Sequence, residues 1–166
     1  MHNKSSSSKF STAVPCGIEP SKVVKLLQDH DAFMECQPHT FKYGFIEKPI
    51  GPKPTIPEGY RVKPIAAAKQ YSVTDKVPGI PTWIWHGDMT STYEFVDIEN
   101  GLFARIRGPL NVVLEVVWEV RETENGEVKL VSDLVIKCSR ILRGVAKSVC
   151  EDGRKRIHAN VFAKLQ

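Results

Sequence analysis

The chain has 166 residues, of which 42 % are hydrophobic and 25 % are charged, and its formal net charge is +4. These values are typical of one globular domain with a sizeable core. The small positive charge disfavours a nucleic-acid-binding surface. The lack of a long apolar run disfavours a secretory signal and an integral membrane protein.

The four cysteines lie far apart and form no C-x-x-C pair; they are Cys16, Cys36, Cys138 and Cys150. Structural zinc sites normally have closely spaced ligand pairs, so we expect no metal. The sequence also contains no glycine-rich phosphate loop or other cofactor motif. It therefore predicts a soluble, cytoplasmic protein with free thiols and no cofactor, and it leaves the oligomeric state open.

The first residues of the chain are polar. Residues 1–9 include four consecutive serines, which cannot bury apolar surface, so we expect a disordered tail there. A single domain should then occupy residues 10–166. Loose alternation of apolar and polar side chains over residues 10–16 predicts its first strand.

Two short helices should follow this strand. The first begins near Pro20, whose missing N–H does no harm in a first helical turn, and it has an apolar stripe at helical spacing. The second spans residues 29–34, with Asp29 or Asp31 as its N-cap. His30 lies between these two aspartates, and we assign it to the capping segment.

The next part of the chain alternates between strands and loops. Aromatic side chains recur at every second position of residues 40–47, which predicts a strand. Residues 49–64 contain five of the eleven prolines, so we expect a long loop, and long ordered loops often act as lids or binding loops. Strand alternation resumes over residues 67–77, with Tyr71 and Asp75 on one face.

The centre of the chain predicts a hairpin. Residues 82–97 form a long alternating segment, and we expect one strand with a bulge at Gly87. Asn100-Gly101 is a strong signal for a two-residue hairpin turn. A strand over residues 102–107 then returns along the first.

The last part of the chain predicts two half-buried strands, over residues 110–121 and 127–138, and a long amphipathic helix over residues 139–165. The apolar stripe of the helix comprises Leu142, Val145, Ala146, Val149, Cys150, Gly153, Ile157 and Val161. Its polar side comprises Arg143, Lys147, Glu151, Arg154 and His158. We expect this side, His158 included, to be solvated; contact with an anionic membrane or a partner is the less favoured alternative.

The order of elements is one strand, two helices, six strands and a long helix. An antiparallel sheet must cover its apolar face, and only the last helix is long enough to do so. The sequence therefore predicts an α+β fold in which a seven-stranded curved antiparallel sheet wraps on the C-terminal helix. A curved sheet and a helix enclose space between them, which favours a ligand site.

This arrangement resembles the helix-grip fold shared by the birch-pollen-allergen family, the START lipid-transfer domains and the aromatic polyketide cyclases. Three segments are similar to motifs of an uncharacterised fungal family in that superfamily: LLQDHDAF at residues 26–33, YSVTDKV at residues 71–77, and NGL at residues 100–102. The resemblance implies a hydrophobic cavity and an origin among fungal natural-product genes. It implies no established activity, so no catalytic residue is carried over.

Candidate ligand-binding residues concentrate on the predicted strands. Large aromatic side chains there either line a cavity and stack on a flat ligand or fill the core. Hydroxyls on the predicted concave face either contact the ligand or bond to neighbouring backbone, provided that the strand register is correct. The predicted ligand-binding set is Trp83, Trp85, Ser91, Tyr93, Phe95, Val116, Trp118, Ser132 and Val149.

Candidate catalytic residues are fewer, and they are Tyr71, His86, Asp88 and Arg105. His86 and Asp88 lie two residues apart and could form a general base, although such a pair more often lies at a solvent-exposed strand end. Arg105 could bind a ligand carboxylate through two parallel hydrogen bonds. The alternative for Arg105 is a cross-strand ion pair with Asp97 or Glu94.

Three functions are consistent with the sequence. The leading hypothesis is a cofactor-free pocket protein that binds an apolar polycyclic or polyketide-like metabolite and guides its cyclisation or isomerisation. The second is a non-catalytic carrier of a lipid or other small molecule. The third is a peptide- or partner-binding module that uses the loop at residues 49–64 and the end of the long helix and has a filled interior.

Overall fold

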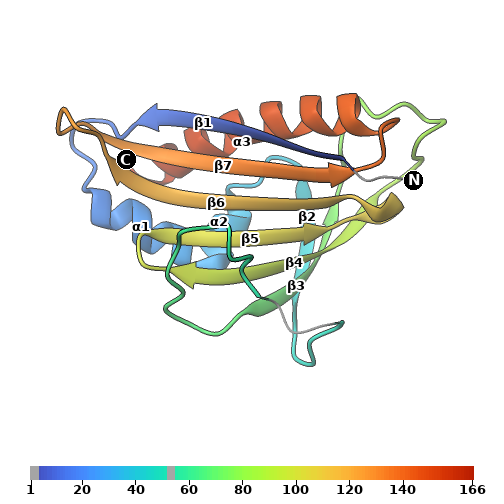
Figure 1. The fold of residues 1–166 in the computed structure, drawn as a ribbon, viewed down its shortest axis with the longest axis horizontal. Coiled ribbons are helices and arrows are strands. Elements are labelled where there is room, and N and C mark those ends of the chain that lie inside the picture. The colour runs from blue at the N-terminus through green and yellow to red at the C-terminus, as the bar shows by residue number, and fades with distance from the viewer. Residues whose placement is uncertain (1–3, 52–54) are drawn as a thin grey trace.

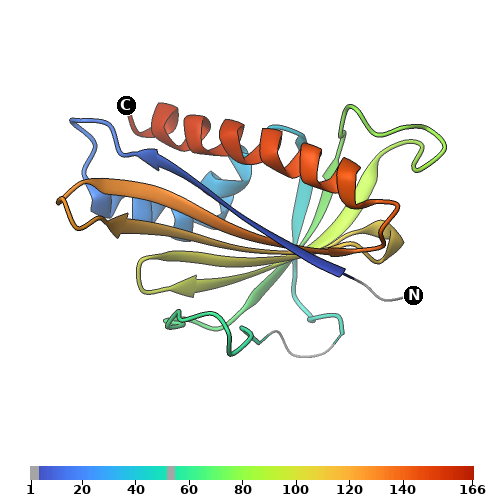
Figure 2. The ribbon, with the colours of Figure 1, turned by 45° about the horizontal axis from the view of Figure 1, so that its top comes forward.

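The computed structural model describes residues 4–51 and 55–166. Its elements are β1 Lys4–Ala13, α1 Pro20–Gln28, α2 His30–Glu35, β2 Thr40–Ile46, β3 Lys69–Asp75, β4 Met89–Ile98, β5 Gly101–Arg107, the 3-10 turn η1 Pro109–Asn111, β6 Val113–Glu122, β7 Val128–Cys138 and α3 Arg143–Leu165. The strands form one antiparallel sheet in the order β1-β7-β6-β5-β4-β3-β2. This sheet curves beneath α3 (Figures 1 and 2). The predicted helix-grip architecture is confirmed.

Strand β1 begins earlier than the sequence suggests. Residues 4–9, predicted to belong to a disordered tail, pair with β7 from Lys4 opposite Cys138 onward, while residues 1–3 of that tail lie outside the described residues. The serine run can form a strand because backbone hydrogen bonds do not depend on side-chain polarity. The side chain of Ser8 also accepts a hydrogen bond from Arg154 of α3, so a polar residue suits this position of β1.

Alternation along the strands divides the sheet into two faces. In β4, Tyr93 and Phe95 join the large core beneath α3, whereas Val96 joins a smaller cluster on the convex side and Glu94 binds arginines there. The predicted hairpin between β4 and β5 is confirmed, but its two-residue turn is Glu99-Asn100, one residue earlier than predicted, and Gly101 is the first residue of β5. A side chain at Gly101 would drive its Cβ into the carbonyl group of Trp118 in β6, so the close approach of these two strands needs glycine.

The long loop between β2 and β3 lies on the convex face, away from α3 (Figure 2). Ile56, Tyr60 and Val62 pack against the convex cluster, and Thr55 accepts a hydrogen bond from Arg105. The expectation of a lid or binding loop over the enclosed space is therefore wrong for the described part of this loop; residues 52–54 lie outside the described residues. Its role is to cover the apolar outer face of the sheet.

Strand β4 is shorter than predicted. It begins at Met89, and residues 82–88 form turns in which Ile84 and Trp85 donate backbone hydrogen bonds to Pro81. The alternating sequence does not extend the strand because β3 ends at Asp75, opposite Met89, and leaves residues 82–88 without a partner on that side. Trp83, Trp85, His86 and Asp88 therefore lie in a loop.

Strand β6 begins at Val113 rather than at residue 110. Leu110 and Asn111 have φ values of 61° and 59°, which lie in the left-handed region that side-chain-bearing residues rarely adopt. This backbone turns the chain sharply before β6 and places Leu110 at the end of the sheet near the start of α3.

Helix α3 presents different sides to the sheet along its length. In its first half, Val145, Val149 and Gly153 face the sheet across open space. In its second half, the buried residues are Arg154, Ile157, His158, Val161 and Phe162. The side of α3 that faces the sheet changes along the helix because the sheet is twisted and the helix is straight. The prediction that Arg154 and His158 are solvated is therefore wrong.

The two short helices close one end of the space beneath α3. Gln28 of α1 donates to the carbonyls of Ile98 and Gly101, and the predicted N-cap of α2 is confirmed, since Asp29 accepts from the backbone N–H of Ala32. The neighbouring His30 is not a capping residue. It is buried and joins α2 to the sheet.

Candidate functional site

A cavity of about 220 Å³ separates the first half of α3 from the concave face of the sheet. Apolar cavities of roughly 150 Å³ are large enough to bind benzene, so this cavity can hold more than a single small ring. The apolar lining from the sheet includes Met89, Phe95, Ile106, Leu114, Val116 and Trp118, and that from α3 includes Val145, Ala146 and Val149. The enclosed space that the sequence predicts is present.

The cavity opens toward the end of the sheet at which α3 begins. Its lining extends to Ile80 and Ile84 before β4, to Leu110 in η1, and to Leu142 before α3. Leu110 is 47 % exposed, so the rim of the cavity reaches the protein surface at this turn. A ligand can enter between these loops without displacing the sheet.

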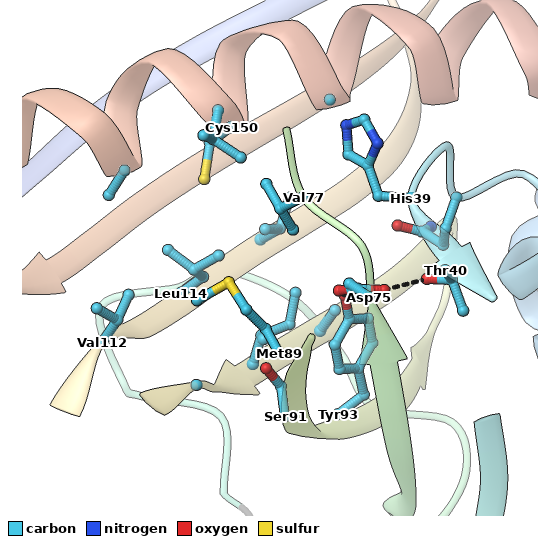
Figure 3. Close-up of a pocket in the computed structure, with 18 of the residues that line it drawn as sticks. His39, Thr40, Asp75, Val77, Met89, Ser91, Tyr93, Val112, Leu114 and Cys150 are labelled. Atoms are coloured by element: carbon cyan, nitrogen blue, oxygen red, sulfur yellow. Dashed lines mark hydrogen bonds between the residues drawn. The ribbon is translucent and has the colours of Figure 1, made fainter. Parts of the chain in front are cut away.

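Three polar side chains meet on the wall formed by β2, β3 and β4 (Figure 3). The hydroxyl of Thr40 donates to Asp75 Oδ1 at 2.6 Å, and the hydroxyl of Tyr93 donates to Asp75 Oδ2 at 3.4 Å. Both donors are neutral, so they orient the carboxyl without neutralising its charge. The three residues come from neighbouring strands, which hold them at fixed spacing.

Burial changes the acidity of this group. It raises the pKa of the Asp75 carboxyl above its ordinary value, while the hydrogen bonds from Thr40 and Tyr93 oppose that rise. Burial and the adjacent Asp75 charge raise the pKa of the Tyr93 hydroxyl well above 10, so Tyr93 remains a hydrogen-bond donor at neutral pH. A carboxyl with a raised pKa beside neutral hydroxyls can accept a proton from a bound molecule.

Other polar groups reach the cavity from different directions. Ser91 lies beside Tyr93 on β4, and Cys150 points into the cavity from α3 (Figure 3). Burial raises the pKa of the Cys150 thiol to about 11, so the sulfur is protonated and weakly nucleophilic at neutral pH. Arg154, one turn further along α3, also lines the cavity.

The predicted ligand-binding residues divide into two groups. Those that line the cavity are Ser91, Tyr93, Phe95, Val116, Trp118 and Val149. Trp83 and Trp85 do not, because they lie in the loop before β4, where Trp83 is 76 % exposed. Ser132 is buried against His158 of α3 and is sealed from the cavity. The binding role of the six lining residues remains a prediction.

None of the four predicted catalytic residues lines the cavity. His86 and Asp88 are exposed in the loop before β4. Arg105 is buried on the convex face, where it forms the alternative ion pair, with Glu94 and also with Glu115. Tyr71 faces the core, but its hydroxyl bonds to His30 Nδ1 at 2.9 Å, and His30 Nε2 in turn lies 2.8 Å from Asp97.

The site residues that sequence reasoning did not select are Thr40, Asp75, Cys150 and Arg154. A signal existed for Asp75, because it ends the alternating face of Tyr71 and Val73 and so places a carboxylate on a buried surface. For Arg154 the signal was its spacing of four residues from Cys150 and three from Ile157, which continues the apolar stripe. Thr40 carried no signal before the pairing of β2 with β3 was known.

Two negative findings apply to the described part of the chain. Over residues 4–51 and 55–166, no group of three or more His, Cys, Asp or Glu side chains is placed to hold a metal ion. Within the same ranges, no helix has the length and apolar character needed to span a membrane.

Solved structures of the same fold cover nearly the whole chain. TTHA0849 from Thermus thermophilus is 12 % identical with a TM-score of 0.59, over 98 % of this chain and 97 % of its own. Ara h 8.0201 is 11 % identical with a TM-score of 0.63, over 98 % of each chain. The di-domain ARO/CYC StfQ from the steffimycin biosynthetic pathway is 10 % identical with a TM-score of 0.65, over 97 % of this chain and 50 % of StfQ. Likeness at these identities shows the fold alone.

Sequence comparison gives a family without an activity. A family model described as "Domain of unknown function (DUF7053)" matches residues 3–166. No curated protein matches the chain. The chemistry of the cavity therefore has to be inferred from its own residues.

Proposed function

The chain belongs to the DUF7053 family, and from its cavity we propose that it is a cofactor-independent pocket protein that binds an apolar polycyclic or polyketide-like metabolite. Within the cavity it guides cyclisation or isomerisation of that metabolite by moving a proton. The observation that carries the proposal is the half-buried carboxyl of Asp75, held by the hydroxyls of Thr40 and Tyr93 on an otherwise apolar wall.

The apolar lining supports the choice of ligand. Aromatic edges from Phe33, Phe95 and Trp118 lie on one side, with ring centroids of Phe33 and Trp118 5.3 Å apart, and aliphatic side chains of α3 lie on the other. Flat ring systems suit an apolar cavity with an aromatic wall because they bury large apolar area at little conformational cost.

The Asp75 group supports the choice of reaction. In its ionised form the carboxylate can accept a proton from a carbon next to a ligand carbonyl, and the raised pKa makes it a better base than an exposed aspartate. The Ser91 hydroxyl can donate a hydrogen bond to the carbonyl oxygen as negative charge develops there, while the single proton of the Tyr93 hydroxyl is donated to Asp75. Return of the proton to a different carbon isomerises the ligand. Alternatively, attack of the enolate carbon on a second carbonyl closes a ring, and the alkoxide that forms takes back the proton from Asp75.

Similarity of fold adds a weaker argument. The StfQ structure is described as an ARO/CYC from a biosynthetic pathway, and it shares the fold of this chain. Fold does not determine function, so this likeness gives weak support to ring-forming chemistry. It assigns a catalytic role to no residue of this chain. The fungal natural-product setting and the cytoplasmic location remain predictions from the sequence.

The test is enzyme-catalysed hydrogen exchange on a bicyclic ketone. We expect the protein to accelerate deuterium incorporation at carbon 1 of 2-tetralone in D₂O, followed by proton NMR, above the rate in buffer. Asp75→Asn should reduce the accelerated rate by roughly 100-fold, the usual scale for loss of a general base. Asp88→Asn makes the same change on the exposed loop and should leave the rate unaltered.

The outcome also separates the alternatives. Binding of 2-tetralone without exchange in the wild-type protein would contradict proton transfer and favour the non-catalytic carrier. Failure to bind any ring compound would contradict both. The peptide-binding hypothesis required a filled interior, and the cavity and the packing of the long loop on the convex face argue against it.

A further inference from the structure

Buried charged side chains have different partners on the two faces of the sheet. On the convex face, Glu94 and Glu115 are almost fully buried, and each is paired with cations: Glu94 with Arg105 and Arg107, and Glu115 with Arg105 and Lys137. The cavity side contains Arg154, which is only 5 % exposed. Among the described residues, Arg154 forms no ion pair with a carboxylate.

The guanidinium of Arg154 has neutral partners only. Its Nη1 donates to the carbonyl oxygens of Ser132 at 3.0 Å and of Ser8 at 3.3 Å, and its Nη2 donates to Ser8 Oγ at 2.7 Å. Its Nε is buried and has no acceptor among the described residues. The carboxylates of Glu151 and Asp133 attract this cation but form no ion pair with it. Burying a cation without a contacting counter-ion is costly, because neutral acceptors replace only part of the lost hydration. An anion in the cavity would add the close negative charge that the protein does not provide.

Arg154 lies far from Asp75 within the same cavity. Its guanidinium binds β1 and β7, whereas Asp75 belongs to β3, and β6, β5 and β4 lie between. Four strand spacings of about 4.8 Å place the two charges on the order of 19 Å apart along the sheet, somewhat less across its curvature. A ligand anion near Arg154 is therefore kept away from the Asp75 carboxylate.

We propose that the cavity selects ring compounds that carry one negative charge, such as an aryl or polycyclic carboxylate, with the anionic group toward Arg154. The apolar rings then lie along the lining between α3 and the sheet, and the opposite end of the molecule approaches Asp75. This inference rests on the proposed binding function, but it does not require that Asp75 transfers a proton.

The test uses two probes that differ in charge and hardly in shape. 1-Naphthaleneacetate and 1-naphthaleneacetamide are titrated against the protein loaded with the neutral fluorescent dye N-phenyl-1-naphthylamine, and displacement of the dye gives each affinity. We expect the acetate to bind at least tenfold more tightly than the amide. Arg154→Gln should abolish this preference for the acetate and leave the affinity for the amide within twofold of the wild-type value. Arg154→Lys should retain most of the preference.

The matched control is Lys155→Gln, which removes the same charge from the exposed neighbour on α3 and should leave the preference intact. Circular dichroism checks that each variant is folded. If Arg154→Gln does not fold, the wild-type pH profile decides: the preference should persist from pH 6 to pH 9, because a guanidinium stays protonated over that range. Loss of the preference within that range would mean that a group other than a guanidinium provides the positive charge, and it would overturn the assignment.

Equal affinities for the two probes in the wild-type protein would overturn the inference and leave the proposed function intact. Persistence of the preference for the acetate in folded Arg154→Gln would also overturn the inference and leave the proposed function intact. Failure of the neutral dye to bind at all would instead contradict the binding function itself. The two failures are therefore distinguishable.

Discussion

His158 Nε2 lies 3.0 Å from Ser132 Oγ in the buried interface between α3 and β7, and Thr12 of β1 lies 2.9 Å from Nδ1 of the same ring. Burial and the nearby Arg154 cation lower the pKa of His158 from 6.5 to about 4. The folded protein therefore favours the neutral imidazole, and this contribution to stability is complete above pH 6.5. It is lost progressively as the pH falls toward 4.

The first prediction follows from this histidine. The free energy of unfolding, measured by urea denaturation, should fall by up to about 3 kcal/mol between pH 7 and pH 4 through this residue, since the gap between 6.5 and about 4 corresponds to that amount. His158→Gln should flatten the stability profile in this window. His86→Gln, on the exposed loop, should not. A His158→Gln profile as steep as that of the wild type would contradict the assignment.

The second prediction concerns the effect of the Asp75 charge on the stability of the fold. The fold raises the pKa of Asp75, so ionisation of Asp75 destabilises the folded state, and this destabilisation is present above the folded-state pKa. Asp75→Asn keeps an acceptor for Thr40 but removes the charge. At pH 8 we expect the melting temperature to rise by about 2–4 °C, the scale of 1 kcal/mol for a chain of this size, while proton transfer is lost. A lower melting temperature at pH 8 would indicate that the charge is compensated in the fold.

The third prediction separates the convex face from the cavity. Arg105 lies between Glu94 and Glu115, so Arg105→Met would leave two buried carboxylates short of a partner. We expect a loss of about 3 kcal/mol of stability by urea denaturation, as for other broken buried ion pairs. Affinity for N-phenyl-1-naphthylamine should remain within twofold of the wild-type value, because the side chain points away from the cavity. A tenfold loss of affinity for the dye in the folded variant would indicate that Arg105 contributes to ligand binding.

Element order could be predicted from the sequence because each signal was local. The Asn100-Gly101 hairpin, the N-cap at Asp29 and the apolar stripe of the last helix each depend on neighbours within a few residues. These signals were sufficient to predict a seven-stranded sheet closed by a terminal helix. The cavity followed from that arrangement.

The site residues could not be predicted in the same way, because they depend on pairing between distant segments. Trp83 and Trp85 alternate like a strand, yet β3 stops at Asp75 and offers them no partner. His30 looked like part of a cap until β3 and β4 supplied Tyr71 and Asp97 as its partners. The twist of the sheet also decides how far the buried side of α3 extends beyond its apolar stripe, and helical spacing did not indicate this for His158.

Filling the cavity with a side chain from α3 tests ligand binding between α3 and the sheet most directly. A Cβ at Gly153 would meet no atom within 4 Å, so Gly153→Phe can extend into the cavity without a clash near the backbone. Gly144→Phe is the matched control, because Gly144 is also a helical glycine at which a Cβ would meet no atom within 4 Å, but it lies outside the cavity lining. Both variants should be at least as stable as the wild type, since glycine is unfavourable inside a helix.

Titration with N-phenyl-1-naphthylamine then compares the three proteins. We expect the wild-type protein and Gly144→Phe to bind the dye with similar affinity and folded Gly153→Phe not to bind it. Undiminished binding by Gly153→Phe, or no binding by the wild-type protein, would contradict a ligand cavity between α3 and the sheet.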